Sequence, residues 1–166
     1  MKKTMMPMAL EVSALFMGKA GAQTLEYCYA PPDSKTYLQK TIGPWKIIKS
    51  KCSCSATTIG KPSSMLVVHA TRASVDQREP ILKLLVFLDK KLKKPVSNIP
   101  VKVDGFDVES ETEGQEDIIA SELKIDLLET ISSSNQIEIG PYKFALRQSS
   151  AAVNAMMSCY GTLTGK

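Results

Sequence analysis

Residues 65–70 read Met-Leu-Val-Val-His-Ala, and this segment indicates the fold class of the chain most directly. It is rich in β-branched residues and follows a turn signal, Pro-Ser-Ser at residues 62–64, so it predicts a β-strand. Residues 81–88 form an apolar run that only Lys83 interrupts. A run of eight residues suits a second, buried strand better than a helix.

Further strands are predicted on both sides of this pair. A strand-like alternation begins at Trp45 and continues to Cys52. Residues 100–106 form a short strand that enters a turn at Asp104-Gly105, a dipeptide that is common in hairpins. The other predicted strands cover residues 106–111, 118–125, 136–139 and 142–146.

The segment that begins at residue 118 fits two kinds of secondary structure. Apolar residues recur with helical spacing from Ile119 to Ile131, but as far as Leu127 they also alternate with polar residues as in a strand. We predict a strand over residues 118–125 and a short helix over residues 127–133.

A last helix is predicted near the C-terminus. Ser149 or Ser150 can cap its first turn, and Gly161 is placed to end it. Its buried face is expected to contain Ala152, Val153, Met156 and Met157. The pattern as a whole predicts a mostly β chain, an antiparallel β-sandwich-like domain with two short helices towards the C-terminus and disulfide stabilisation.

The chain begins with the features of a secretory signal peptide. Two lysines follow Met1, an apolar stretch covers residues 5–17, and Ala20-Gly21-Ala22 supplies small residues before a cleavage site. Glu11 inside the apolar stretch would be costly in a membrane-crossing segment, which leaves a cytosolic amphipathic helix as the alternative.

We predict that residues 1–22 are a signal peptide and that residues 23–166 form a single exported β-rich domain. The domain would be periplasmic or secreted, in the bacterial envelope. Its 144 residues suit one hydrophobic core. No other stretch approaches the length of an uninterrupted apolar span, so no transmembrane segment is expected.

The charge of the predicted domain argues against a nucleic acid as partner, and charged residues are concentrated in two segments. The predicted domain has 18 cationic and 16 acidic residues, a net charge of +2, which is too weakly basic for a dedicated nucleic-acid-binding protein. Residues 89–94 are a basic run, and residues 104–117 contain seven carboxylates and no basic residue. Both runs are predicted to be solvated loops.

The four cysteines of an exported chain predict two disulfides, with candidates Cys28, Cys52, Cys54 and Cys159. A Cys52–Cys54 bond is disfavoured, because in a strand these side chains point the same way and lie about 7 Å apart. The two remaining pairings each join one of them to Cys28 and the other to Cys159. Both pairings stay open.

Cys52 and Cys54 also permit a different chemistry. With His69 they offer two thiolates and one imidazole to a soft ion such as Cu(I) or Zn(II). The set has no obvious fourth ligand and no second cluster, so we predict no metal site and no cofactor. A thiol-dependent metal-binding or redox function that uses Cys52 and Cys54 remains an alternative.

Sequence motifs for catalysis are missing. The chain has no nucleophile elbow, zinc-binding helix, phosphate loop or dinucleotide fingerprint. His69 is the only histidine and sits inside an apolar strand, where a structural role is more common than a catalytic one. We therefore predict no catalytic residues and a protein that is not an enzyme.

Three segments show a family resemblance. They are Gly43-Pro44-Trp45-Lys46-Ile47, Val101-Lys102-Val103-Asp104-Gly105 and, most specifically, Tyr142-Lys143-Phe144-Ala145-Leu146 with the small-residue helix that leads to Cys159. They resemble segments of the invasion-associated locus B family of exported bacterial proteins. The family's mid-chain cysteine pair is missing around residues 112–122, so its disulfide scheme is not carried over. The resemblance implies an envelope-associated accessory protein, linked in some members to host-cell entry.

These predictions together favour a non-enzymatic exported accessory or binding protein. Its partner would be an unknown protein of the envelope or of a host. A secreted inhibitor or immunity protein, which blocks an enzyme with a rigid disulfide-held loop, is the second alternative.

Overall fold

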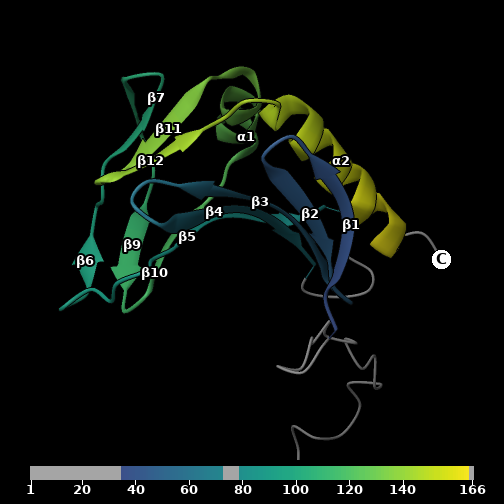
Figure 1. The fold of residues 1–166 in the computed structure, drawn as a ribbon, viewed down its shortest axis with the longest axis horizontal. Coiled ribbons are helices and arrows are strands. Elements are labelled where there is room, and N and C mark those ends of the chain that lie inside the picture. The colour runs from purple at the N-terminus through teal and green to yellow at the C-terminus, as the bar shows by residue number, and fades with distance from the viewer. Residues whose placement is uncertain (1–34, 73–78, 165–166) are drawn as a thin grey trace, which may run out of the picture.

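Two antiparallel β-sheets and two helices form the fold in the computed structural model, which describes residues 35–72 and 79–164 (Figure 1). The predicted signal peptide over residues 1–22 and the disulfide candidate Cys28 lie outside these ranges. The antiparallel β architecture with two helices towards the C-terminus confirms the predicted fold class.

The larger sheet contains eight strands in the order β1-β2-β3-β4-β5-β10-β9-β6. Each neighbouring pair is antiparallel, and β2 to β5 follow one another as a meander. The strands of this sheet are β1 (Tyr37–Ile42), β2 (Trp45–Lys49), β3 (Ser53–Gly60), β4 (Ser64–Thr71), β5 (Ile81–Phe87), β6 (Val96–Ser97), β9 (Thr112–Gln115) and β10 (Ile118–Glu122).

The smaller sheet has four strands in the order β12-β11-β7-β8. Its members are β7 (Val101–Val103), β8 (Phe106–Val108), β11 (Gln136–Ile139) and β12 (Tyr142–Ala145), and the helices are α1 (Ile125–Ser133) and α2 (Ser149–Thr164). The two sheets meet at Lys61 and Lys143, whose backbones exchange hydrogen bonds of 3.0 and 2.9 Å.

The core lies against one face of the larger sheet. Alternate residues of β3, β4 and β5 are buried there, including Ala56, Val68 and Leu84. The smaller sheet covers one part of this face and α2 covers another, as Figure 1 shows. A Cβ atom at Gly60 would overlap the Phe144 ring, so a glycine at the end of β3 lets β12 approach closely.

Trp45 joins the first strands to the end of the chain. Its side chain is fully buried, and its indole Nε1 donates a hydrogen bond of 2.9 Å to the backbone carbonyl of Arg147. A buried indole satisfies its N–H in this way while contributing a large apolar surface. The start of β2 is therefore attached to the segment just before α2.

The single strand predicted over residues 45–52 is two strands. The chain turns between β2 and β3, where the Ser50 N–H donates to the Ser53 carbonyl at 2.8 Å and their hydroxyls lie 2.7 Å apart. Serine side chains can support a turn in this way without glycine or proline. The alternation of apolar and polar residues over residues 45–52 therefore gives no sign of the turn that joins β2 and β3 in a hairpin.

The acidic stretch contains more strand than the sequence predicted. β8 forms within the return strand predicted over residues 106–111 but ends at Val108, and β9 lies where a solvated loop was predicted. In β9, Thr112 and Gly114 are buried while Glu113 stays exposed. Because successive side chains of a strand point to opposite faces, β9 can form while the Glu113 carboxylate stays in water. The basic run 89–94 is a loop, as predicted.

Residues 118–133 form a strand followed by a helix, as predicted. β10 ends at Glu122 and α1 begins at Ile125, each a few residues earlier than expected. The last helix, however, does not end at Gly161 but continues to Thr164. Thr162 supports the additional turn, because its hydroxyl donates a hydrogen bond of 2.7 Å to the Cys159 carbonyl. Leu163 then packs against the core.

Candidate functional site

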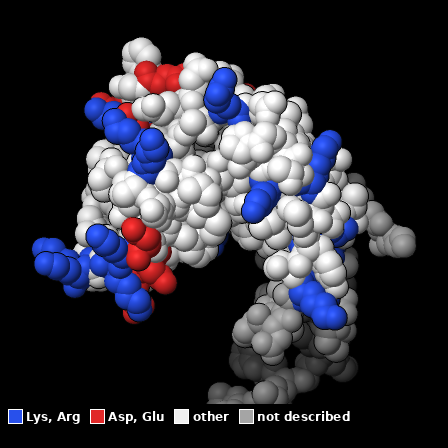
Figure 2. All heavy atoms as spheres, viewed as in Figure 1, with Lys and Arg blue, Asp and Glu red and all other residues white. Residues whose placement is uncertain are grey.

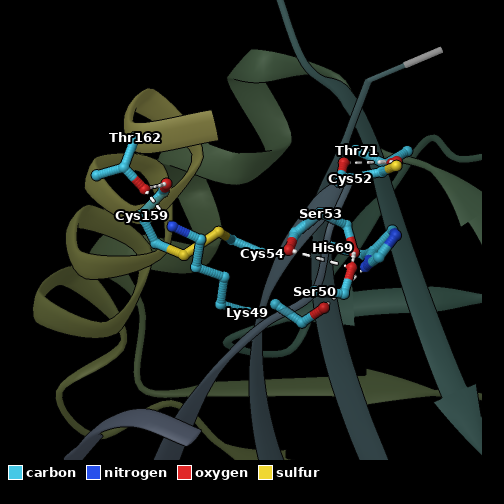
Figure 3. Close-up of a disulfide and its surroundings, with 10 residues drawn as sticks. Lys49, Ser50, Cys52, Ser53, Cys54, His69, Thr71, Cys159 and Thr162 are labelled. Atoms are coloured by element: carbon cyan, nitrogen blue, oxygen red, sulfur yellow. Dashed lines mark hydrogen bonds between the residues drawn. A yellow bond between two sulfur atoms is a disulfide. The ribbon is translucent and has the colours of Figure 1, made fainter. Parts of the chain in front are cut away.

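A disulfide joins Cys54 of β3 to Cys159 of α2 (Figure 3). The two Cα atoms are 6.0 Å apart although the residues are separated by 105 positions in the sequence. Cys54 and Cys159 are both buried. The structure thus selects one of the two pairings that the sequence left open for Cys159.

Cys52 is a second disulfide-bonded cysteine, and its partner lies outside the described residues. In Figure 3 its sulfur points away from the Cys54–Cys159 bridge. Its carbonyl accepts hydrogen bonds of 3.2 Å from the Arg72 N–H and the Thr71 hydroxyl. Neither sulfur of the Cys52-x-Cys54 pair is a free thiolate, so a thiol-dependent role would first require reduction.

His69 does not join the two cysteines in a common site. Cys54 pairs with Ala70 across the β3–β4 ladder, which places Cys54 and His69 on opposite faces of the sheet. Within residues 35–72 and 79–164, no three His, Cys, Asp or Glu side chains are grouped so that they could hold a metal ion.

His69 instead forms a polar contact on the face of the larger sheet that points away from Cys54. Its Nδ1 lies 2.7 Å from the Ser55 hydroxyl. Burial lowers the pKa of His69 below its ordinary value, and the neighbouring Lys83 cation lowers it further. The imidazole is therefore neutral at pH 7.

The Ser55–His69 pair has the composition of a catalytic dyad but lacks its electrostatics. A general base must accept a proton, and in serine hydrolases a carboxylate stabilises the imidazolium that forms. Here the cross-strand neighbour of His69 on β5 is Lys83, which opposes that charge. The pair is better explained as a satisfied polar contact on a sheet face.

The side of the larger sheet that faces away from α2 and the smaller sheet is here named the open face. No element of the described chain packs over it, yet it has many apolar side chains. They come from β2, β3, β4, β5 and β10 and are Ile48, Ile59, Met65, Val67, Ile81, Leu85, Phe87 and Ile118. Ile59 and Phe87 are exposed, Val67 is buried among its neighbours, and the others are partly buried.

Four of these residues form a continuous row across four strands. Ile59 pairs with Met65, Met65 with Phe87, and Phe87 with Ile118. Ile59 is 71% exposed and Phe87 is 39% exposed. At the usual strand spacing the row is about 15 Å long. Apolar side chains gathered in this way on a surface are typical of an interaction site.

Charged residues border the apolar part of the open face. Lys46 on β2 and Glu113 on β9 lie at opposite ends of one row across the sheet. Lys83 and Glu122 are cross-strand partners on β5 and β10. All four are exposed. The open face therefore has an apolar centre and a border with charges of both signs.

Charge is divided along the chain and across the surface. Residues 35–72 contain six lysines and one arginine but no carboxylate, and the part of the surface built by β1 and β2 shows basic residues without acidic ones (Figure 2). The acidic residues gather in β8, β9 and the segments that follow.

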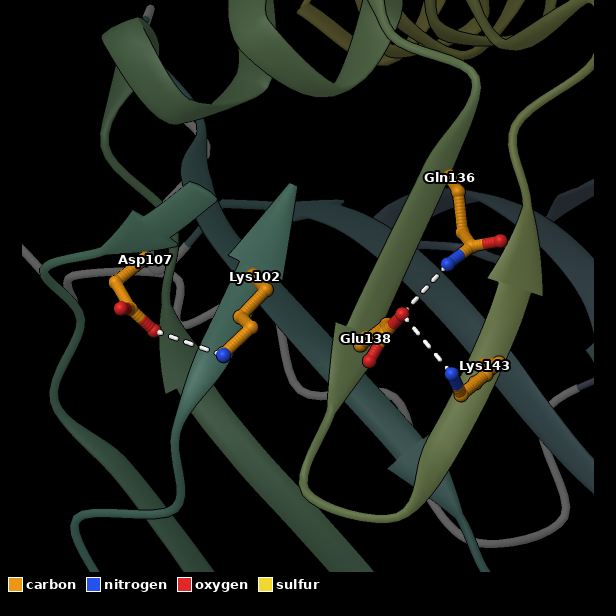
Figure 4. Close-up of polar contacts among 5 residues, drawn as sticks. All are labelled: Lys102, Asp107, Gln136, Glu138 and Lys143. Carbon is orange, nitrogen blue, oxygen red and sulfur yellow. Dashed lines mark hydrogen bonds and ion pairs between the residues drawn. The ribbon is translucent and has the colours of Figure 1, made fainter. Parts of the chain in front are cut away.

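Three ion pairs are found in the described part of the chain, and none of them involves β1 to β4. Lys143 lies 3.1 Å from Glu138, which also accepts a hydrogen bond from Gln136 (Figure 4). The other two pairs join Lys102 to Asp107 at 3.7 Å and Lys91 to Glu116 at 3.6 Å. Such exposed pairs contribute little to stability.

A hollow of about 380 Å³ lies between β8, β10 and the start of α1. Four carboxylates border it, and its one lysine is Lys124. The carboxylates are those of Glu109, Glu111, Glu122 and Asp126. The lining contains no histidine or cysteine.

Comparison with known proteins gives no assignment, since no family model, no curated protein and no solved structure matches the chain. The resemblance to the invasion-associated locus B family stays a prediction from the sequence. Neither helix of the described ranges has the length and apolar content needed to cross a membrane.

Proposed function

We propose that this chain is an exported, non-enzymatic binding protein of the bacterial envelope that docks a partner protein on its open face. The observation that carries the proposal is the apolar row Ile59–Met65–Phe87–Ile118, in which Ile59 and Phe87 are exposed and over which no element of the described residues packs. Phenylalanine and methionine are enriched in protein interfaces, where an apolar centre is surrounded by a polar rim. The open face has this arrangement.

The charges at the border favour a protein over a lipid surface as the partner. Anionic membranes select clusters of lysine and arginine. The border of the open face instead contains Glu113 and Glu122 as well as Lys46 and Lys83. Charges of both signs suit a protein surface that supplies complementary groups.

Two features support export to the envelope. The first is the signal-like sequence of residues 1–22, and the second is the use of cysteines in disulfides, which persist in oxidising compartments. The resemblance to the invasion-associated locus B family suggests host-cell entry as the process in which the protein takes part. Mass spectrometry of the exported protein tests the first feature, and the expected N-terminus is Gln23 after cleavage behind Ala22.

Site-specific photo-crosslinking in intact cells tests the binding proposal. A photoreactive phenylalanine analogue replaces Ile59 on the open face, and in a matched variant it replaces Ile125, an equally apolar side chain on α1 that is 54% exposed. Position 59 is expected to yield one discrete adduct, which the additional change Phe87→Ser should weaken strongly. Equal adducts from both positions, or none from position 59, would contradict the proposal.

The same experiment separates the alternatives. An adduct with a single enzyme, whose activity the purified protein blocks, would identify a secreted inhibitor or immunity protein. A thiol-dependent metal or redox role predicts two reactive thiols on Cys52 and Cys54 in material taken directly from the envelope. Thiol counting without reductant would detect them.

A further inference from the structure

β1 is an open edge of the larger sheet. It pairs with β2 on one side, and no strand of the described residues pairs with its other side. In an antiparallel ladder, alternate residues direct their N–H and C=O groups away from the partner strand. The outer edge of β1 therefore presents backbone donors and acceptors to any extended segment that approaches it.

The side chains of β1 are also accessible. Every residue of the strand is exposed except Ile42, which is partly buried. Tyr37 is 56% exposed and Leu38 is 61% exposed, so the edge includes apolar groups that a bound segment can cover.

The surroundings of β1 are positively charged. Lys35 and Lys40 flank its first residues, and Lys46 lies opposite Thr41 on β2. No carboxylate occurs in β2, in β3 or in α2, the elements nearest this edge. A local field without acidic residues attracts segments of negative charge and raises their association rate.

We propose that β1 accepts an extended acidic segment of a partner protein as an additional strand of the larger sheet. Backbone hydrogen bonds would supply affinity, and carboxylates on one face of the added strand, placed against Lys40, would supply selectivity. Lys46 lies on the other face of the sheet, paired with Thr41, and adds to the positive charge around the edge. The proposal stands on the edge and its charge. It shares Lys46 with the border of the open face but uses none of the apolar row.

The same charges disfavour a second copy of this chain as the occupant. Pairing two β1 strands would bring lysines from both copies together, and like charges across a strand pair are destabilising. The register shift between Leu38 and Lys40 further interrupts regular pairing. The lysines around β1 repel the same edge of a second copy and attract an acidic strand, and both effects together define which partner β1 accepts.

Binding of a synthetic probe to the full-length exported protein tests the proposal. The probe is an acetylated hexapeptide of alternating glutamate and valine, and its matched control has alternate amides N-methylated, which keeps the charge but removes backbone donors. The unmodified peptide is expected to bind and to protect amides of β1 from hydrogen exchange. The methylated peptide should bind at least ten-fold more weakly; equal binding of the two would overturn strand addition.

Two charge variants with the same net change locate the contact. Lys40→Glu/Lys46→Glu is expected to weaken peptide binding roughly ten-fold. Lys90→Glu/Lys93→Glu, in the exposed loop before β6, should leave it within about two-fold. Similar losses in both variants would show an effect of net charge alone and would overturn the contact with β1. All four side chains are exposed, and unchanged circular dichroism is the check on folding.

Two further binding experiments test whether other anions, rather than an acidic peptide, bind to this part of the surface. Vesicles of phosphatidylglycerol and a single-stranded oligonucleotide are added in place of the peptide, again with hydrogen exchange as the readout. Tighter binding of either without protection of β1 amides would identify a polyanion site and overturn the proposal. The variant Phe87→Ser, on the open face, is expected to bind the peptide like wild type, so failure of this inference and failure of the proposed function are distinguishable.

Discussion

Cys54 and Cys159 join the middle of the larger sheet to the last helix across 105 residues of sequence. α2 also packs against β2, β3 and β4, so the bond reinforces a contact that apolar packing already makes. A cross-link over a loop of this length restricts the unfolded chain most strongly.

Replacement of Cys159 by serine is therefore expected to lower the free energy of unfolding of the oxidised protein by about 2–5 kcal/mol. The same substitution should change little when both proteins are fully reduced, because the bond is then absent from both. Denaturant unfolding with and without reductant makes the comparison. A loss of equal size under both conditions would show that Cys159 acts through packing alone.

The second disulfide is expected to join Cys28 to Cys52. Cys52 is bonded, Cys54 and Cys159 are bonded to each other, and Cys28 is the remaining cysteine of the sequence. Proteolysis without reductant, followed by mass spectrometry, should yield a linked pair of peptides that contain residues 28 and 52. Detection of a free Cys28 or of dimers linked through Cys52 would refute this pairing.

Loss of the Trp45 indole N–H should weaken the attachment of β2 to the segment just before α2. Trp45→Phe removes the donor to the Arg147 carbonyl and leaves a smaller ring in a fully buried site. We expect destabilisation of roughly 1–3 kcal/mol, measured by far-ultraviolet circular dichroism in denaturant. Tyr37→Phe, at an exposed position, is the control and should have almost no effect.

Stability should fall as the pH is lowered past 6.5, the ordinary pKa of the imidazole that His69 regains on unfolding. Burial, and then Lys83, lower the pKa of His69 in the folded protein, so just below pH 6.5 the unfolded chain binds more protons than the folded one. The loss continues until the pH passes the folded-state pKa. His69→Gln should remove this component, and Lys83→Gln should reduce it. Unfolding curves between pH 7.5 and pH 5 measure it, and identical slopes for wild type and His69→Gln would count against it.

Local sequence predicts those elements whose pattern is complete within one segment. β11 spans Gln136–Ile139, the range expected from its alternation, and β4 extends the expected segment by one residue at each end. β5 is a strand as expected but is not buried throughout. Its even-numbered residues Leu82, Leu84 and Val86 face the core, while Lys83 and Phe87 are exposed on the other side.

Other features depend on which strands become neighbours. β1 gave no signal because an exposed edge strand needs no apolar face. The cysteine pairing was left open because it depends on where α2 lies on the sheet. The row on the open face joins residues from four strands, and no single strand contains more than one of them. The position of α2 on the sheet creates the disulfide, and register across the sheet creates the candidate binding surface. Neither can be read from a local pattern.

The position of Cys159 also sets an order of assembly for a chain that crosses a membrane from its N-terminus. Under the proposed export, Cys54 emerges 105 residues before its partner. Until then, the β3 thiol remains available to incorrect partners, of which Cys52 is the nearest in sequence. In an exported chain, correct oxidation would therefore follow translocation of the 105 residues that separate the two cysteines, and a product truncated before residue 159 lacks both the bond and the final turns of the helix that covers the sheet.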